Sequence, residues 1–331
     1  MGLDSQELGS FEEAGRRTNE LLQEIGRVII GQDEIVRQVL ICLLAGGHVL
    51  IEGVPGLGKT LLVRALAHCF GGESRRIQFT PDLMPSDVTG HAIFNMQQQL
   101  FEVRKGPVFT NLLLADEINR APAKTQAALL EVMQERQVTI EGESYSVAEP
   151  FMVLATQNPI EQDGTYPLPE AQLDRFMMKT LMDYPTESAE IEIVRKRTHK
   201  RIGDDLQIDD LEQDLNSHAH KEDIITLREI CALVAVDETV LDYAVRIARE
   251  TRSRVGMLQG AGPRATIALV RSARANAVLE GRHFVTPDDV KQLAKPVLRH
   301  RIHLTPDLEI EGSTPDRILD ELLDAVDAPR V

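Results

Sequence analysis

Five short apolar runs alternate with amphipathic stretches over the first half of the chain. The first, third and fourth runs are almost continuously hydrophobic, which is typical of parallel strands covered on both faces. The stretches between them, such as TLLVRALAHCF and KTQAALLEVMQE, repeat apolar residues at helical spacing. This alternation predicts an α/β core around a parallel sheet. The five runs are HVLIEG, RIQFT, NLLLADE, FMVLATQN and MMKTLMDY.

The same pattern divides the chain into three parts. Residues 1–20 are mainly polar, and we expect them to be flexible or loosely attached. Residues 21–184 contain all five predicted strands and form the α/β core. From 185 to 331 the apolar positions recur only at helical spacing, with Pro, Gly and Asp between the segments, so this part is predicted to be all-helical.

Two segments interrupt the core and are predicted to be insertions at one end of the sheet. Residues 90–109 hold short apolar pieces around several glutamines. Residues 137–147 alternate apolar and polar positions on both sides of a Glu-Gly-Glu sequence, which predicts a small hairpin. Insertions of this kind often carry function.

Composition narrows the class of protein. The formal charge of −16 argues against a surface that coats nucleic acid, although a local basic channel remains compatible with it. The sequence has no apolar stretch long enough for a membrane span and no secretory signal, so we expect a cytoplasmic protein. Cys42, Cys69 and Cys231 lie far apart and are expected to be reduced core residues. The histidines have no spacing typical of a metal site.

The clearest chemical signal is a glycine-rich turn that follows the first predicted strand. GVPGLGKT fits the phosphate-loop pattern G-x-x-x-x-G-K-[ST] in full. Backbone N–H groups of such a turn, and the start of the following helix, attract phosphate. A simple strand-to-helix connection is the alternative, but the position between strand and helix favours phosphate binding. The expected nucleotide contacts are Gly53, Val54, Pro55, Gly56, Leu57, Gly58, Lys59, Thr60 and Leu61.

Polar side chains end two further predicted strands. Asp116 and Glu117 follow an apolar run, where an acid is badly placed for packing. Asp116, together with the Thr60 hydroxyl, is expected to hold Mg²⁺, and Glu117 to activate the attacking water. Asn158 ends the next strand and could connect the γ-phosphate with that water. The alternatives are a helix cap for the two acids and turn chemistry for Asn158.

The order of these motifs resembles the AAA+ ATPases and, within them, the MoxR family. The stretches EGVPGLGKT, DEINRAPAKTQAALLEVMQE and ATQNPIEQDGTYPLPEAQLDRFMMK carry the resemblance, which covers roughly residues 20–325. It implies an ATPase core with a helical lid, assembled into a ring that is usually a hexamer. It also implies that 90–109 is the insert in the second helix and 137–147 the hairpin before the first sensor.

The resemblance assigns further roles. Asn158 matches the first sensor, Arg175 in LDRF matches the arginine finger that acts on ATP of a neighbouring subunit, and Arg264 in GPRA matches the lid sensor. Ile30 and Gly31 lie in a segment similar to the adenine site, and Gln78 is a candidate for the residue that controls the catalytic glutamate.

Each arginine can also be considered from the residues alone. For Arg175, a salt bridge with the adjacent Asp174 is the simpler explanation, and an exposed pair contributes only about 0–1 kcal/mol. An arginine finger increases turnover about 10³- to 10⁵-fold. Arg264 begins a predicted helix, an unfavourable end for a cation, and this favours a phosphate partner.

The expected function is Mg²⁺-dependent ATP hydrolysis that moves the lid and remodels a protein partner. The resemblance suggests a partner with a von Willebrand factor A domain. One alternative is a nucleic-acid motor or loader, which the acidic charge disfavours. The other is a monomeric P-loop kinase, which gives Arg175 no role.

Overall fold

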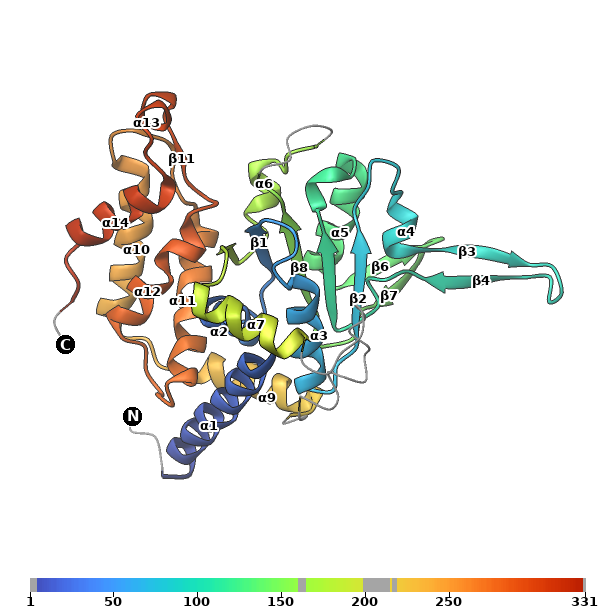
Figure 1. The fold of residues 1–331 in the computed structure, drawn as a ribbon, viewed down its shortest axis with the longest axis horizontal. Coiled ribbons are helices and arrows are strands. Elements are labelled where there is room, and N and C mark those ends of the chain that lie inside the picture. Colours follow the sequence, from blue (N-terminus) through green and yellow to red (C-terminus); the bar gives the residue numbers. More distant parts are fainter. Residues whose placement is uncertain (1–4, 160–164, 199–214, 216–218, 330–331) are drawn as a thin grey trace.

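The computed structural model describes residues 5–159, 165–198, 215 and 219–329 (Figure 1). The five predicted strands form one sheet in the order β2-β5-β8-β1-β9, and every neighbouring pair is parallel. The prediction of an α/β fold with a parallel sheet is therefore confirmed. The strands are β1 (Val49–Gly53), β2 (Ser74–Gln78), β5 (Leu112–Asp116), β8 (Met152–Gln157) and β9 (Met178–Met182).

Helices cover both faces of the sheet. Successive residues of a strand point to opposite faces. Val49 and Ile51 accordingly belong to an apolar cluster that includes α2 and α3, whereas Leu50 belongs to a second cluster that includes α5. This burial on both sides explains the continuous apolar runs of the central strands. The three helices are α2 (Asp33–Leu44), α3 (Lys59–Cys69) and α5 (Ala123–Glu135).

The N-terminal segment differs from the sequence-based expectation. Residues 5–28 form the long helix α1 (Ser5–Val28), so the prediction of a flexible 1–20 segment is wrong for residues 5–20, while residues 1–4 lie outside the described part. The inward positions are buried: Phe11, Ala14, Thr18, Leu21 and Ile25. Their spacing of three and four residues places them on one helix face.

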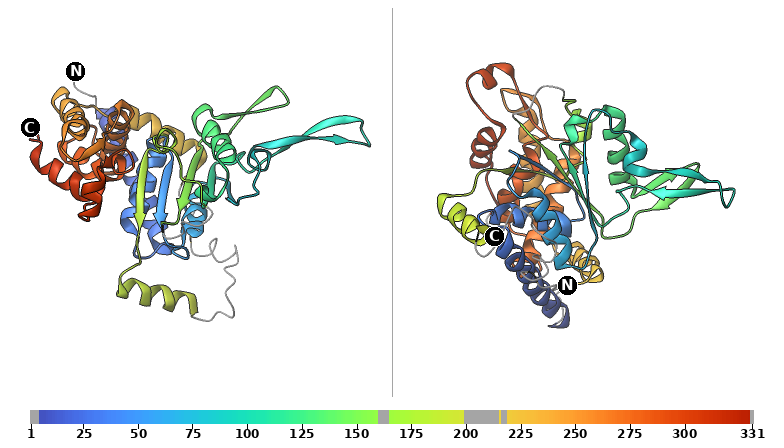
Figure 2. Two further views of the ribbon diagram at one scale, coloured as in Figure 1. Left: turned by 90° about the horizontal axis from the view of Figure 1, so that it is seen from above. Right: turned by 45° about the vertical axis from the view of Figure 1, so that its right-hand side comes forward.

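Both insertions are antiparallel hairpins, as predicted for 137–147. The first consists of β3 (Gly90–Asn95) and β4 (Leu100–Lys105), preceded by the short helix α4 (Pro85–Thr89). The second consists of β6 (Gln137–Ile140) and β7 (Glu143–Ser146). Figures 1 and 2 show both hairpins projecting from the same side of the core, and the first reaches farther.

The C-terminal part is mainly helical, and from residue 238 onward it lies on the side of the core away from the two hairpins (Figure 1). The prediction of an all-helical region is wrong in one detail, because β10 (Met257–Gln259) and β11 (His303–Leu304) form a short antiparallel ladder. The helices are α7 (Glu187–Thr198), α9 (Lys221–Leu233), α10 (Glu238–Ser253), α11 (Pro263–Leu279), α12 (Pro287–Leu298), α13 (Pro306–Ile310) and α14 (Pro315–Ala325), and we call α9–α14 with β10 and β11 the lid. None of the helices in the described part of the chain has the length and hydrophobicity that crossing a membrane requires.

The lid and the core share one hydrophobic cluster, which runs from Phe11 to Leu323. Helix α1 contributes to this continuity because it packs against both α3 of the core and α11 of the lid. At Gly15 the two backbones approach so closely that a Cβ atom would lie 2.6 Å from the Cα of Gly281. A boundary near residue 185 therefore stays a prediction.

His48, one residue before β1, connects three elements of the core. Its ring is buried, Nδ1 accepts a hydrogen bond from Val153 N–H at 2.9 Å, and Nε2 lies 3.0 Å from the carbonyl of Met133. This arrangement requires the neutral ring with the proton on Nε2. Burial, with a smaller contribution from nearby arginines, lowers the pKa of His48 to about 4, although the hydrogen bond with the Met133 carbonyl opposes this shift.

A lowered pKa makes stability depend on pH in a defined direction. The unfolded chain binds a proton at His48 below about pH 6.5, whereas the folded chain does not do so until about pH 4. The contribution of His48 to the free energy of unfolding should therefore fall by about 1.4 kcal/mol for each unit by which the pH is lowered between these values. Urea unfolding at several pH values should show a shallower fall for His48→Gln. If the free energy of unfolding of the two proteins had the same pH dependence, this prediction would be contradicted. His91→Gln, on the exposed β3 strand, is the control and should keep the pH dependence of the wild type.

Candidate active site

The glycine-rich turn joins β1 to α3 with a left-handed backbone. Gly56 and Gly58 have φ angles of 85° and 87°, a conformation that glycine adopts without strain. A Cβ atom at either position would meet nothing within 4 Å, so backbone conformation and not space requires glycine here. Helix α3 begins at Lys59, directly after the turn, so its free N–H groups lie where the sequence places the phosphates.

The side chain of Lys59 bonds back to the first residue of the same turn. Its ammonium group donates a hydrogen bond of 2.6 Å to the carbonyl of Gly53, at the end of β1. Burial lowers the pKa of Lys59, and the carboxylates of Asp116, Glu117 and Glu52 oppose that shift. The ammonium group therefore lies in the field of the acidic strand ends, as expected of a group shared between the loop and a ligand.

The two acids at the end of β5 are held by different partners. Asp116 accepts one bond from Arg76 at 2.6 Å and another from the Thr156 hydroxyl at 2.6 Å. Glu117 accepts from the amide of Gln78 at 2.7 Å and from Arg120 at 3.3 Å. The carboxylates are thus separately oriented, and the contact expected between Gln78 and the glutamate is present.

Glu117 has an unusual backbone conformation. Its φ of 55° and ψ of 50° lie in the left-handed region, and it precedes the short helix η1 (Ile118–Arg120). For a residue other than glycine this conformation costs on the order of 1 kcal/mol and persists only where neighbours enforce it. The N–H of Glu117 donates to the Thr156 hydroxyl at 2.8 Å, which fixes the turn.

Thr156 is a residue that sequence analysis did not identify. One buried hydroxyl in β8 donates to Asp116 and accepts from the backbone of Glu117, so it connects both acids to the central strand. Arg76, on the edge strand β2, was likewise missed as a partner of Asp116. The sequence does show Thr156 as a polar residue within a buried apolar run. Its partners could not be predicted, however, because they depend on which strand lies next to β8.

Asn158 follows β8 directly and is half-buried. Because β8 lies between β5 and β1, Asn158 leaves the sheet between the acids and the glycine-rich turn. Residues 160–164, which belong to one of the stretches that carry the family resemblance, lie outside the described residues.

Arg175 does not pair with its neighbour. Its guanidinium donates to the carbonyl of Leu130 in α5 at 2.7 Å. Asp174 instead binds two lid arginines, Arg301 at 2.8 Å and Arg264 at 3.7 Å. The simpler explanation, a salt bridge between Arg175 and Asp174, is therefore wrong, and Arg264 at the start of α11 lies beside Asp174.

The turn between α1 and α2 contains Ile30 and Gly31, expected near the adenine. Ile30 is half-buried. A Cβ atom on Gly31 would lie 2.6 Å from the Cβ of Ala189 and 3.2 Å from that of Pro185, so this turn packs against the start of α7. The side-chain amide of Gln32 also donates to the carbonyl of Asp183 at 2.8 Å.

The oxygen ligands available for Mg²⁺ are few. Within the described ranges, no group of three His, Cys, Asp or Glu side chains is placed to hold a metal ion. Thr60, the second residue of α3, and Asp116 offer one hydroxyl and one carboxylate. Mg²⁺ takes oxygen ligands and keeps several waters, so such a sparse oxygen set fits it when phosphate oxygens complete the shell.

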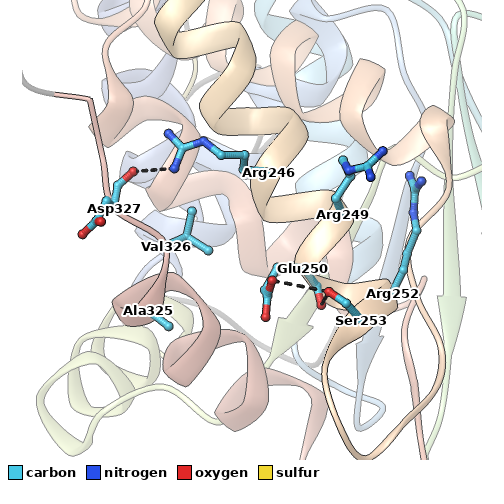
Figure 3. A pocket seen from close by; sticks show the side chains of 8 residues that line it. All are labelled: Arg246, Arg249, Glu250, Arg252, Ser253, Ala325, Val326 and Asp327. Atoms are coloured by element: carbon cyan, nitrogen blue, oxygen red, sulfur yellow. Dashed lines mark hydrogen bonds between the residues drawn. The ribbon is translucent and has the colours of Figure 1, made fainter.

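A separate pocket of about 530 Å³ lies on the outer face of the lid (Figure 3). Arg246, Arg249 and Arg252 of α10 line one side, and Val326 and Asp327 after α14 line the other. Arg246 bridges the two sides with a bond of 3.0 Å to the backbone carbonyl of Asp327. None of the residues expected to bind nucleotide lines this pocket.

The bridge made by Thr156 can be tested by stability. Thr156→Val keeps the shape but removes the donor to Asp116 and leaves the N–H of Glu117 without its acceptor. The free energy of unfolding should fall by about 1–3 kcal/mol in denaturant titrations. Thr156→Ser retains the hydroxyl and should lose much less. Equal stability of Thr156→Val and the wild type would contradict the bridge.

Comparison with known proteins agrees with this geometry. Residues 48–178 match the ATPase family associated with various cellular activities (AAA), and residues 249–322 match the AAA lid domain. A candidate ATPase from Cytophaga hutchinsonii, known from its crystal structure, is 41% identical with a TM-score of 0.88, covering 98% of this chain and 100% of its own.

Named relatives identify the family. Chaperone MoxR1 of Mycobacterium tuberculosis is 44% identical over 317 residues, which is 93% of this chain and 81% of that protein. YeaC of Bacillus subtilis is 45% identical over 310 residues, or 93% of each chain, and the protein MoxR of Methylorubrum extorquens is 31% identical over 92% of each. The chain therefore belongs to the MoxR family of AAA+ ATPases.

Proposed function

We propose that the chain hydrolyses ATP with Mg²⁺ and uses the cycle, within a ring of subunits, to remodel a protein partner. The observation that carries the proposal is the arrangement at the carboxyl edge of the sheet. The glycine-rich turn with Lys59 follows β1, the two acids follow β5, and Thr156 in the strand between them holds both acids.

In this proposal the turn binds the phosphates. Backbone N–H groups of the turn and of the start of α3, from Gly56 to Leu61, would surround them, with Gly53, Val54 and Pro55 lining the same turn. The Lys59 ammonium would exchange its bond to the Gly53 carbonyl for a phosphate oxygen. Thr60 and Asp116 would hold Mg²⁺, which when bound neutralises charge on the phosphates. Ile30 and Gly31 would contact the adenine.

Glu117 would take the proton from the attacking water, and Asn158 would orient that water against the γ-phosphate. Gln78 and Arg120 occupy the same carboxylate oxygen of Glu117. These bonds fix the orientation of the carboxylate and engage one of its two oxygens, so the contact with Gln78 would control when Glu117 acts as a base.

The bond between Arg175 and Leu130 supports a role outside the chain's own site. Arg175 is bound to a backbone carbonyl of its own core, and among the residues that the structure describes it has no carboxylate partner. In a ring it would release this carbonyl to stabilise charge on ATP of the next subunit. Arg264, near it on the lid, would sense the nucleotide. A hexamer is the expected ring.

Remodelling of a protein is supported by the name of Chaperone MoxR1 and by one exposed surface. The β3–β4 hairpin exposes Met96, Leu100 and Phe101 by 85%, 61% and 73%, respectively. Such side chains fit contact with another protein better than with nucleic acid, which attracts basic groups. A partner with a von Willebrand factor A domain, and a location in the cytoplasm, are part of this proposal.

Two substitutions separate binding from hydrolysis. Lys59→Ala removes a charge-assisted contact worth about 1.5–3 kcal/mol, so ATP affinity should fall about 10- to 100-fold. Glu117→Gln should bind ATP normally but hydrolyse it about 10²- to 10⁴-fold more slowly. Fluorescent-nucleotide titration and phosphate release measure the two effects. Normal ATP affinity of Lys59→Ala, or full activity of Glu117→Gln, would sink the corresponding assignment.

Arg175→Ala tests the ring. This variant should bind ATP with unchanged affinity and lose about 10³- to 10⁵-fold in turnover. Adding Lys59→Ala subunits, which keep Arg175 but bind ATP far more weakly, should restore hydrolysis at ATP concentrations that fill only the Arg175→Ala sites, because a neighbour then supplies the arginine. Turnover and ultracentrifugation of the mixture provide the measurement. Unchanged turnover in Arg175→Ala alone would exclude the mechanism.

A further inference from the structure

Arg301 follows α12 in the lid and is one of the most buried charged residues, with 7% of its surface exposed. Its guanidinium contacts the core segment that contains Arg175. Nη2 donates to the carbonyl of Phe176 at 2.7 Å and to that of Asp174 at 3.3 Å. These two carbonyls flank Arg175, so one lid side chain holds the backbone on both sides of it.

Further bonds extend the contact along the same segment. Nη1 of Arg301 donates to the carbonyl of Met177 at 3.1 Å, and Nε donates to the carboxylate of Asp174 at 2.8 Å. His300 Nε2 lies 3.0 Å from the carbonyl of Phe176. Arg299 donates to the carbonyl of Lys179 at 3.2 Å. Three consecutive lid residues therefore bind the core backbone from 174 to 179.

Asp174 joins this contact to a second lid element. Its Oδ1 atom accepts from Arg301, while Oδ2 lies 3.7 Å from Nη1 of Arg264 at the start of α11. The side chain of Arg264 is 60% exposed, whereas that of Arg301 is 4% exposed. The buried arginine thus fixes the segment, and the exposed one is able to leave Asp174 without disturbing the buried bonds.

The chemistry at this position calls for arginine. Burying a cation is costly unless hydrogen bonds compensate for the lost water. Burial lowers the pKa of Arg301, and the bond to Asp174 opposes that shift. A planar guanidinium with five N–H donors bonds several fixed carbonyls at once, which an ammonium group on a flexible stem does not.

We propose that Arg301 is a positioning residue for Arg175: it fixes the 174–177 backbone to the lid, so that lid movement sets where Arg175 meets the neighbouring subunit's ATP. This inference rests on the proposed role of Arg175 in the ring. The lid of one subunit would then control hydrolysis at the adjacent site through the hydrogen bonds of Arg301 to this segment.

The test uses the mixture of two inactive proteins described above. The acceptor, Arg175→Ala, binds ATP, and the donor, Lys59→Ala, supplies Arg175. Adding Arg301→Lys to the donor should lower the recovered turnover about 10- to 100-fold, because small misplacements of a catalytic group have effects of that size. Adding it to the acceptor should change the recovered turnover less than about twofold, since that subunit supplies no arginine.

Comparing Arg301→Lys in the donor with Arg301→Lys in the acceptor separates a positioning role from a general structural role. An equal loss in donor and acceptor, or no loss in the donor, overturns the inference. No recovery in the mixture without Arg301→Lys instead overturns the ring mechanism of the proposed function, and with it the basis of this inference. ATP affinity of the acceptor and ultracentrifugation of each mixture are measured alongside.

Two further variants show whether a loss with Arg301→Lys could come from misfolding alone. Asp174→Asn in the donor changes the partly exposed acceptor of Arg301 and should lower recovery in the same direction. Arg246→Lys is the matched control, because Arg246 donates to a backbone carbonyl as Arg301 does, but this bond joins two parts of the lid at the outer pocket (Figure 3). It should leave recovery unchanged in the donor. A loss with Arg246→Lys as large as with Arg301→Lys would overturn the inference.

Discussion

Pairing of β8 with both of its neighbours is the constraint on which the site depends. Ala155 pairs with Leu50 of β1 and with Ala115 of β5, so Thr156, Ile51 and Asp116 form the next row across the sheet. The acids and the glycine-rich turn are far apart in sequence, and only this register brings them to one edge. Within this row the hydroxyl of Thr156 bonds both to the carboxylate of Asp116 and to the backbone N–H of Glu117, and so fixes the two acids to β8. A shift of one residue would reverse every side chain of β8 and separate them.

Much of this arrangement could be predicted from the sequence because its signals are local. Five buried runs and a glycine-rich turn predict strands, sheet class and phosphate loop without knowledge of their neighbours. Thr156 and Arg76 could not be assigned roles, since their partner Asp116 belongs to another strand. Helix α1 was missed although its inward positions have helical spacing. Two of them, Ala14 and Thr18, are small or polar and contribute little apolar signal, and their burial depends on the distant helix α11.

The lid and the core are joined by two kinds of contact that respond differently to motion. The shared apolar cluster is non-directional and tolerates small displacements of the helices. The bonds from Arg299, His300 and Arg301 are directional, and each weakens steeply when its geometry is lost. A lid that rotates over the cluster would therefore pull on residues 174–177, which precede β9, while β9 itself stays paired with β1 from Met178 onward. The core helices, held to the sheet by apolar packing, would not have to follow.

The position of α1 has a consequence for how the protein is made. The side-chain amide of Asn19 in α1 donates to the carbonyl of Leu279, and part of the buried face of α1 packs on α11. During synthesis α2 and α3 emerge early and can cover part of α1, whereas the part of its apolar face that packs on α11 stays uncovered until the lid has been made. Contacts between such distant residues slow folding and leave exposed apolar surface in the meantime. The N-terminal helix is thus made first but completes its packing only when the lid has emerged from the ribosome.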